Sequence, residues 1–320
     1  MKKMLLVFNP KAGRGDFVRN LYKVVELYTR AGYEIVVYPT GGSGDAHEFI
    51  LERGAAFDLV VCSGGDGMIN EAVNACMRIQ NPPPLAYIPS GTVNDFAATL
   101  KFPRDILKSA RFVVTGQPRM IDAGVLSSPV EVPGEKYFSK EKYFSYVAAF
   151  GLFTNIPYTT DQKAKNILGR TAYFLEGIKY LANVPSVKCV IKVDEEASGA
   201  NPGNNTIEGN FMLGIIANAT SIGGFRFNVE ESAAIDDGFF EVIFIHSPKN
   251  IIELQEIVAA LLGNQTDPQL VIKRRARKIE FSSAEPCDWT LDGEFGGRHE
   301  NLTITNLHKK LNIVLPKQSK

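Results

Sequence analysis

The strongest constraint on the fold is a glycine-rich turn placed between an apolar run and a helical pattern. Val60–Cys62 is apolar, Gly64-Gly65-Asp66-Gly67 follows, and apolar residues then recur at helical spacing, which predicts a helix from Met68. Glycine lets a ligand approach the backbone closely, and a helix N-terminus presents unpaired N–H groups, so this turn suits a phosphate. Because a carboxylate repels phosphate, Asp66 implies a bridging Mg²⁺; a plain strand-to-helix turn capped by Asp66 is the alternative interpretation.

Short apolar strands alternate with helices throughout residues 1–125. This alternation predicts an α/β fold, a Rossmann-like nucleotide domain with a parallel sheet, in which ligands bind beyond the carboxyl ends of the strands. The expected strands are Met4–Phe8, Glu34–Tyr38, Leu59–Cys62 and Leu85–Ile88, and the expected helices are Phe17–Ala31, Asp45–Arg53 and the helix from Met68.

Polar, glycine-containing turns follow each of these strands. They are Asn9–Gly13, Pro39–Gly44, Ser63–Gly67 and Ser90–Asp95. Because the carboxyl ends of parallel strands share one edge of a sheet, the four turns are expected to lie together. Four such turns at one edge favour a nucleotide crevice over four unrelated turns.

The second half of the chain has a different pattern, and the change falls near Asp122-Ala123-Gly124. Long strands dominate there, which predicts an all-β, β-sandwich-like domain of mainly antiparallel strands. The expected strands are Tyr143–Phe150, Val187–Asp194, Ile207–Asn218, Phe239–His246, Val271–Ser283 and Leu302–Leu315, and the expected helices are Ile167–Leu181 and Asn250–Leu262.

Charge and cysteine content limit the partners and the compartment. Lys plus Arg and Asp plus Glu both number 35, so no overall field points to nucleic acid. The run Lys273–Lys278 fits either a solvated strand face or contact with anionic lipid headgroups, worth about 1 kcal/mol per basic residue. The 4 cysteines show no zinc spacing, and no stretch has the length of a transmembrane helix, so a cytoplasmic protein is expected.

Taken in order, the motifs resemble the diacylglycerol kinase catalytic family, in its branch of bacterial soluble lipid kinases. Its first domain also resembles that of the NAD kinases. One departure is Met68, where the family usually has Thr or Ser. The resemblance rests on Asn9–Gly13, Gly44–Ala46, Gly64–Gly67 with Asn70-Glu71, Pro89–Ala97, Asp122–Gly124, Gly223–Phe225, Asp236–Gly238 and Leu291–Glu294.

The resemblance implies ATP as phosphate donor and Mg²⁺ as the metal. The nucleotide-binding residues that it implies are Asn9, Pro10, Lys11, Ala12, Gly13, Thr40, Gly64, Gly65, Asp66, Gly67, Asn70, Glu71, Thr92, Asn94 and Asp95. The metal-binding residues that it implies are Asp66, Asp95, Asp236 and Asp237. Simpler roles remain open for several of them: Asn70 and Glu71 as helix caps, Asp95 as an N-cap, and Asp236–Gly238 as a hairpin turn.

Asp292-Gly293-Glu294 contains the candidate catalytic base. A lipid hydroxyl is a poor nucleophile, and a carboxylate within hydrogen-bond reach can accept its proton. The two carboxylates would point the same way on a strand but diverge across a tight turn, so Glu294 is favoured only slightly over Asp292. A plain Asp-Gly hairpin is the alternative interpretation.

The resemblance thus predicts a lipid kinase of two domains, residues 1–125 and 126–300, with a tail, 301–320, that packs back on the first. The expected reaction converts diacylglycerol to phosphatidic acid, with peripheral contact at the inner face of the membrane and a homodimer as the favoured assembly. Three alternatives stay open: another lipid acceptor such as phosphatidylglycerol or a sphingoid base, a NAD kinase-like enzyme, and a non-catalytic nucleotide-binding regulator. The NAD kinase pattern for the second nucleotide turn is missing, which disfavours that enzyme.

Overall fold

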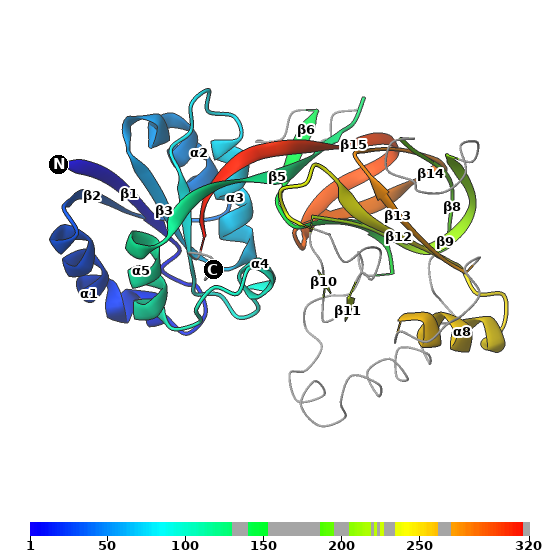
Figure 1. Ribbon diagram of the computed structural model, residues 1–320, viewed down its shortest axis with the longest axis horizontal. Coiled ribbons are helices and arrows are strands. Elements are labelled where there is room, and N and C mark those ends of the chain that lie inside the picture. The colour runs from blue at the N-terminus through cyan, green and yellow to red at the C-terminus, as the bar shows by residue number, and fades with distance from the viewer. Residues whose placement is uncertain are drawn as a thin grey trace.

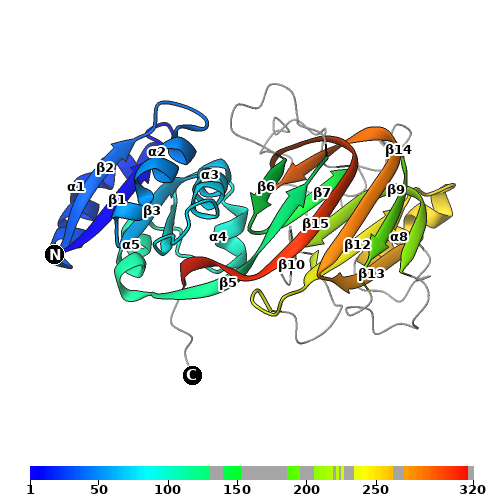
Figure 2. The ribbon, with the colours of Figure 1, turned by 90° about the horizontal axis from the view of Figure 1, so that it is seen from above.

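The computed structural model describes residues 1–129, 140–152, 186–194, 205–218, 221–222, 225–226, 234–261 and 270–315. An α/β half and a β-rich half lie side by side, and two long strands run between them (Figures 1 and 2). The helix expected at 167–181 and the motif residues Gly223 and Gly224 lie outside the described residues. No helix in the described part of the chain is long and apolar enough to cross a membrane.

The N-terminal half places helices on both sides of four parallel strands. β1 pairs in parallel with β2 and β3, and β3 pairs in parallel with β4. The strands are β1 (Lys2–Phe8), β2 (Tyr33–Pro39), β3 (Leu59–Gly64) and β4 (Leu85–Pro89). The helices are α1 (Asp16–Arg30), α2 (Asp45–Arg53), the short 3₁₀ turn η1 (Gly54–Ala56), α3 (Asp66–Cys76), α4 (Asp95–Thr99) and α5 (Ile106–Thr115).

In the described residues of the C-terminal half, antiparallel strands predominate. A helix, α8 (Ile251–Leu261), lies at the outer end of these strands (Figure 1). The strands are β5 (Gln117–Ser127), β6 (Glu141–Phe144), β7 (Val147–Gly151), β8 (Val187–Val193), β9 (Thr206–Ala217), β10 (Ser221–Ile222), β11 (Phe225–Arg226), β12 (Phe240–His246), β13 (Val271–Ala276), β14 (Lys278–Leu291) and β15 (Glu294–Leu315).

The two halves share one 13-stranded sheet, because β5 and β15 cross between them. β15 pairs with β14 in the second half and, at Ile313, runs parallel to β4 of the first. β5 follows β15 antiparallel along most of this path. The sheet is therefore mixed. The strands β1–β4 pair in parallel as predicted, but the prediction of a Rossmann-like parallel sheet is corrected, because these strands belong to a larger sheet that is mainly antiparallel among the described residues.

Three buried clusters form the core. One cluster packs α1 and α5 on one face of the parallel strands through residues such as Phe17, Tyr28 and Ile106. A second packs α2, α3 and α4 on the opposite face and continues into the second half through Met212 and Ile243. The third fills the β-rich half around Trp289. Continuous apolar burial beneath α3 fixes this helix between the halves.

Candidate active site

Three turns at the carboxyl ends of β1, β3 and β4 lie against one another. A Cβ atom added at Gly13 would stand 2.4 Å from the carbonyl oxygen of Ser90, and one added at Gly91 would stand 2.4 Å from the Cα atom of Gly65. Backbones this close leave no room for a side chain at Gly13 or Gly91. Gly13 also has φ +55°, a conformation that glycine adopts at little cost.

The third of these turns is held by Asn94. Its Oδ1 accepts from the Gly91 N–H at 3.1 Å and from the Tyr87 hydroxyl at 3.2 Å, and its Nδ2 donates to the Gly91 carbonyl oxygen at 2.8 Å. The left-handed backbone of Asn94, φ 57°, suits an asparagine at the start of α4. Asn94 therefore shapes the loop, while Thr92 beside it is exposed.

The turns that follow β1 and β2 are also closed by their own side chains. Asn9 accepts from the Lys11 N–H at 2.8 Å, and the buried Thr40 donates from its hydroxyl to the carbonyl oxygen of Phe8 at 3.3 Å. Ala12 is buried, Pro10 is half-buried, and Lys11 is exposed. The amides of Asn9, Ala12 and Thr40 also donate within the protein, so the polar groups of these turns mainly hold the turns themselves.

Asp66 is the first residue of α3, so the helix begins two residues before the predicted start at Met68. Its Oδ1 lies 3.4 Å from the Phe96 amide nitrogen, at the N-terminus of α4 that also carries Asp95. Two helix N-termini therefore converge at Asp66. Met68 itself is buried and packs on Gly64, where an added Cβ would stand 2.5 Å from the Met68 Cβ.

Glu71 and Asn70 contact protein groups. Glu71 accepts from the Gly44 N–H at 2.8 Å and lies 3.4 Å from the His47 amide nitrogen, so it caps the N-terminus of α2. Burial raises the pKa of Glu71, and these backbone donors oppose the shift. Asn70 donates to Asp292 at 3.3 Å.

Asp292 and Gly293 form a two-residue hairpin turn between β14 and β15, with φ values of 52° and 88°. Positive φ at both positions is the type I′ geometry that Asp-Gly favours. The Asp292 carboxylate is buried and accepts from the amides of Ser145, Tyr146 and Val147, each at 2.9 Å, and from the Ser145 hydroxyl at 3.1 Å. With the Asn70 bond, both of its oxygens are fully engaged.

Glu294, two residues further on, faces the glycine turn. Its Oε1 lies 2.8 Å from the position of a Cβ atom at Gly67, so a side chain at Gly67 would displace the end of the Glu294 side chain. Burial raises the pKa of Glu294, and the carboxylates of Glu71, Asp66 and Asp292 raise it further. The structure thus brings Glu294 and Asp66, from opposite halves of the chain, to the same turn.

The other two predicted metal ligands lie in ion pairs. Asp237 pairs with Arg275 at 2.7 Å and accepts from the Phe239 N–H, while Asp236 pairs with Arg119 at 3.3 Å. Across the described residues, no group of three or more His, Cys, Asp or Glu is arranged to hold a metal ion. The oxygen donors of Asp66 and Glu294 and their mutual repulsion fit a divalent cation between them, whereas the Arg275 guanidinium opposes one at Asp237.

The basic run is largely engaged within the protein. Arg275 bonds Glu241 as well as Asp237, and the guanidinium carbons of Arg275 and Arg277 lie 4.8 and 4.4 Å from the ring centroid of Phe239. Lys278 pairs with Glu280 at 2.7 Å. These contacts favour the strand-face interpretation of Lys273–Lys278.

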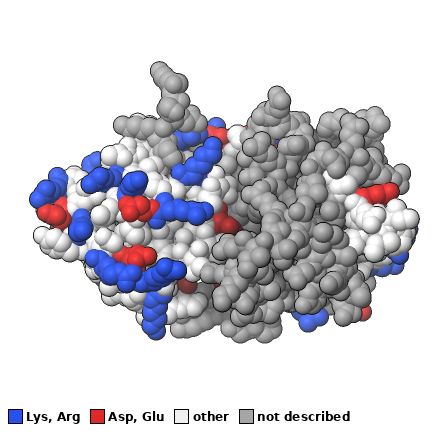
Figure 3. Space-filling model, turned by 90° about the horizontal axis from the view of Figure 1, so that it is seen from below, with Lys and Arg blue, Asp and Glu red and all other residues white. Residues whose placement is uncertain are grey.

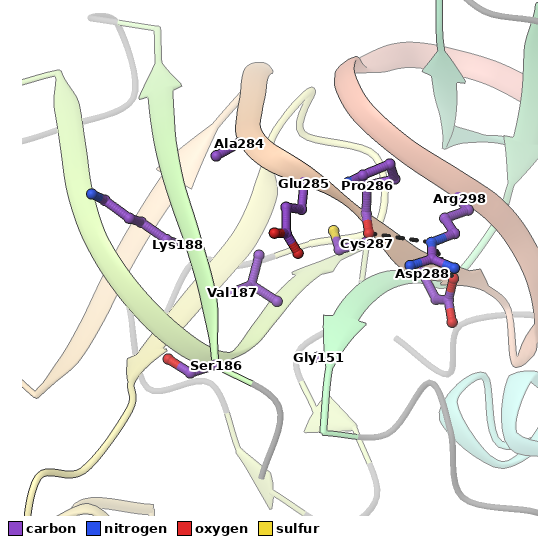
Figure 4. Close-up of a pocket in the computed structure, with 10 residues that line it drawn as sticks. All are labelled: Gly151, Ser186, Val187, Lys188, Ala284, Glu285, Pro286, Cys287, Asp288 and Arg298. Atoms are coloured by element: carbon purple, nitrogen blue, oxygen red, sulfur yellow. Dashed lines mark hydrogen bonds and ion pairs between the residues drawn. The ribbon is translucent and has the colours of Figure 1, made fainter.

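A separate cavity of about 610 Å³ lies further along the β14–β15 hairpin (Figure 4). Arg298 lines this cavity, and its Nε lies 3.8 Å from Asp288 Oδ1 and 3.3 Å from the Pro286 carbonyl oxygen. Lys188 and Glu285 also line it. This mixed charge provides polar groups and no continuous apolar wall.

Comparison with known proteins identifies the family. Residues 3–126 match the model of the diacylglycerol kinase catalytic domain, and residues 151–314 match that of the YegS C-terminal NAD kinase beta sandwich-like domain. A diacylglycerol kinase from Bacillus subtilis (strain 168) is 32% identical over 320 residues, which covers 99% of this chain and 98% of that protein. The chain belongs to the diacylglycerol kinase catalytic family. It is a kinase that phosphorylates a lipid alcohol, and kinases of this family use ATP.

Other relatives agree with this assignment. A diacylglycerol kinase from Staphylococcus aureus (strain bovine RF122 / ET3-1) is 31% identical and covers 98% of this chain and 93% of its own. A crystal structure of a diacylglycerol kinase from Bacillus anthracis str. Sterne superposes with a TM-score of 0.70 at 21% identity, covering 98% of this chain and 97% of its own. At that identity the superposition supports the fold alone.

Proposed function

We propose that this lipid kinase transfers the γ-phosphate of ATP to the free hydroxyl of diacylglycerol and forms phosphatidic acid. The relatives that carry the name diacylglycerol kinase support this acceptor, since they match along nearly the whole chain. The observation that supports the proposal most is the approach of Glu294 to the Gly67 turn, because a carboxylate from the second half then lies at the N-terminal end of α3, where the phosphates are proposed to bind. The proposed domains are residues 1–125 and 126–300, with residues beyond 300 returning to the first.

The three glycine turns would hold the triphosphate through backbone N–H groups. Lys11 and Arg14 are exposed beside them, and in Figure 3 Lys and Arg side chains are interspersed with Asp and Glu side chains over the N-terminal half. Two exposed cations beside the turns would attract a polyphosphate even though the whole chain is neutral. Asp66 would hold Mg²⁺, which when bound neutralises charge between the β- and γ-phosphates.

Glu294 would act as the base. The lipid oxygen forms a bond to the γ-phosphorus as the bond to the β-γ bridging oxygen breaks, and ADP leaves. The hydroxyl proton passes to the Glu294 carboxylate, whose raised pKa suits proton acceptance. Asp292 is the weaker candidate because its lone pairs already accept backbone N–H groups. It would orient the turn that carries Glu294.

The test measures ATP-dependent ³²P transfer by purified protein into lipids in mixed micelles. Diacylglycerol, phosphatidylglycerol and a sphingoid base serve as acceptors, with NAD as a soluble control. We expect label in phosphatidic acid and loss of that label in Asp66→Ala. Label in another lipid would change the acceptor and keep the mechanism, whereas label only in NAD, or none, would overturn the proposal.

A further inference from the structure

A stripe of polar residues runs along α3, the helix that begins at Asp66. Asn70, Asn74 and Arg78 follow Asp66 at intervals of four, so they share one face of the helix and of the turn that follows it. Apart from Gly67 and Glu71, the positions between them are apolar, so the stripe lies within a helix that otherwise has the pattern of a core helix. Every member of the stripe beyond Asp66 contacts the second half of the chain.

Asn74 binds β6 as a neighbouring strand would. Its Oδ1 accepts from the Tyr143 N–H at 3.0 Å, and its Nδ2 donates to the Tyr143 carbonyl oxygen at 2.8 Å. An asparagine amide is the side chain that supplies one donor and one acceptor side by side at this reach. With 1% of its surface exposed, Asn74 makes these bonds away from water, where unmade bonds are costly.

Arg78 reinforces the same contact. Its Nη2 donates to the Glu141 carbonyl oxygen at 2.7 Å, and its Nη1 donates to the Asn74 carbonyl oxygen at 2.8 Å. The guanidinium carbon lies 4.9 Å from the ring centroid of Tyr143. Asn74 and Arg78 therefore hold β6 at two successive points along the helix.

At the other end of the stripe, Asn70 reaches the turn that carries Glu294. It donates to Asp292, which also fixes the amides of Ser145, Tyr146 and Val147 that link β6 to β7. The segment held by Asn74 and the turn held by Asn70 are thus joined to each other through Asp292. One face of α3 therefore contacts both the β6 segment and the turn that carries Glu294.

We propose that Asn74, supported by Arg78, is a positioning residue that sets the separation of Glu294 from the Asp66 turn. This inference rests on the proposed function, in which those two carboxylates act on the lipid hydroxyl and the nucleotide. Catalytic groups must be held within fractions of an ångström, and small displacements cost rate more than they cost binding. Asn74 bonds Tyr143 and Asn70 and is not among the residues proposed to bind ATP, so KM for ATP is expected to change little.

The test compares wild type with Asn74→Leu, which keeps a similar volume and removes both bonds to Tyr143. We expect kcat to fall at least about tenfold while KM for ATP stays within about twofold. Arg78→Lys should show a smaller loss of kcat with the same split. Ser109→Ala, which removes a buried hydrogen bond in α5, is the control that lowers stability without changing kcat.

Hydrogen exchange gives a readout that needs no substrate. In Asn74→Leu the amides of residues 143–147 should exchange at least about tenfold faster, whereas the β1 and β3 amides should not change. Unchanged exchange at residues 143–147, or an unchanged kcat in an active folded variant, overturns the positioning role. If wild type phosphorylates no lipid, the proposed function fails, and the exchange result still decides whether the stripe holds the second half.

Discussion

Asp292 and Glu294 are two residues apart but have opposite surroundings. Asp292 is buried and accepts five hydrogen bonds, whereas Glu294 lies against the Gly67 turn beside other carboxylates. A saturated carboxylate stabilises its partners, and a carboxylate among like charges is the better proton acceptor. The two carboxylates are therefore proposed to have different roles, although they are nearly adjacent in the sequence.

Glu294→Gln should separate these roles. We expect kcat to fall by about 10²–10⁴-fold, the usual contribution of a general base, with KM for ATP nearly unchanged. Thermal stability should stay level or rise, because the change removes one of several repelling carboxylates. Steady-state kinetics and a thermal melt on the same preparation check both, and a variant with wild-type kcat would exclude Glu294 as the base.

The activity should also depend on pH through Glu294. Its pKa is raised above the ordinary value of about 4.3, and only the ionised form accepts a proton, so kcat/KM should fall as the pH drops through this raised value. Added Mg²⁺ should move the fall to lower pH, because a nearby cation favours the ionised form. A pH profile of kcat/KM at two Mg²⁺ concentrations tests this; an acid limb that persists in Glu294→Gln would assign it to another group.

At the scale of elements, Gly13 closes the contact between the turns that follow β1 and β4. Gly13→Ala places a methyl group against the Ser90 carbonyl oxygen and strains a left-handed backbone, so we expect KM for ATP to rise at least about tenfold. Gly32→Ala is the matched control, since Gly32 also has positive φ but has open space around it. It should cost about 1 kcal/mol of stability and leave KM unchanged. Equal effects of the two variants on KM would contradict the contact.

The β14–β15 turn is a second element with a testable role. Asp292→Ala leaves three buried amides without their acceptor, so we expect a loss of roughly 3 kcal/mol or more in the free energy of unfolding. Asp288→Ala on the same hairpin removes only a partly exposed pair with Arg298 and should cost less than about 1 kcal/mol. Urea unfolding of both variants measures the difference, and similar losses would show that Asp292 is not the anchor of the turn.

Element types could be predicted from the sequence where the pattern is local. The apolar strands of the first half and the Asp-Gly hairpin before Glu294 follow from periodicity and turn chemistry. The errors in the predicted strand boundaries come from contacts between residues that are far apart in the sequence. The strand predicted over Tyr143–Phe150 is two strands, β6 and β7, because Asp292 accepts hydrogen bonds from the amides between them. The strand predicted over Val271–Ser283 is interrupted at Arg277, whose N–H donates to Asp194.

Prediction of the candidate site is limited in the same way, because contacts between residues far apart in the sequence have no local pattern. The motifs identified the turns and both carboxylates, but the choice between Asp292 and Glu294 depended on which donors the fold brings to each. Asn74 went unnoticed as well, although its spacing of four from Asn70 was visible, because a buried asparagine within an apolar helix pattern has no local signature. Its partner Tyr143 lies 69 residues away.

At the scale of the whole molecule, Asp122 lies where β5 and β15 run between the two halves. This fully buried carboxylate on β5 accepts from the Gly238 N–H at 2.6 Å and from the Lys309 N–H at 2.7 Å, and it pairs with His308 at 3.1 Å. β15 has its register shift at this place, between Leu307 and Leu311. One side chain thus joins both crossing strands to the segment before β12.

Asp122→Ala should therefore weaken the coupling between the halves as well as each contact. We expect a loss of at least about 3 kcal/mol, because the Gly238 and Lys309 amides and the His308 ring lose their hydrogen-bond partner, and a thermal transition that broadens or splits as the halves unfold separately. Asp236→Ala, which removes a partly exposed pair with Arg119 nearby, should cost less than about 1 kcal/mol and keep one transition. Scanning calorimetry distinguishes the two. A single sharp transition in Asp122→Ala would mean that the shared sheet of β5 and β15 couples the halves without this carboxylate.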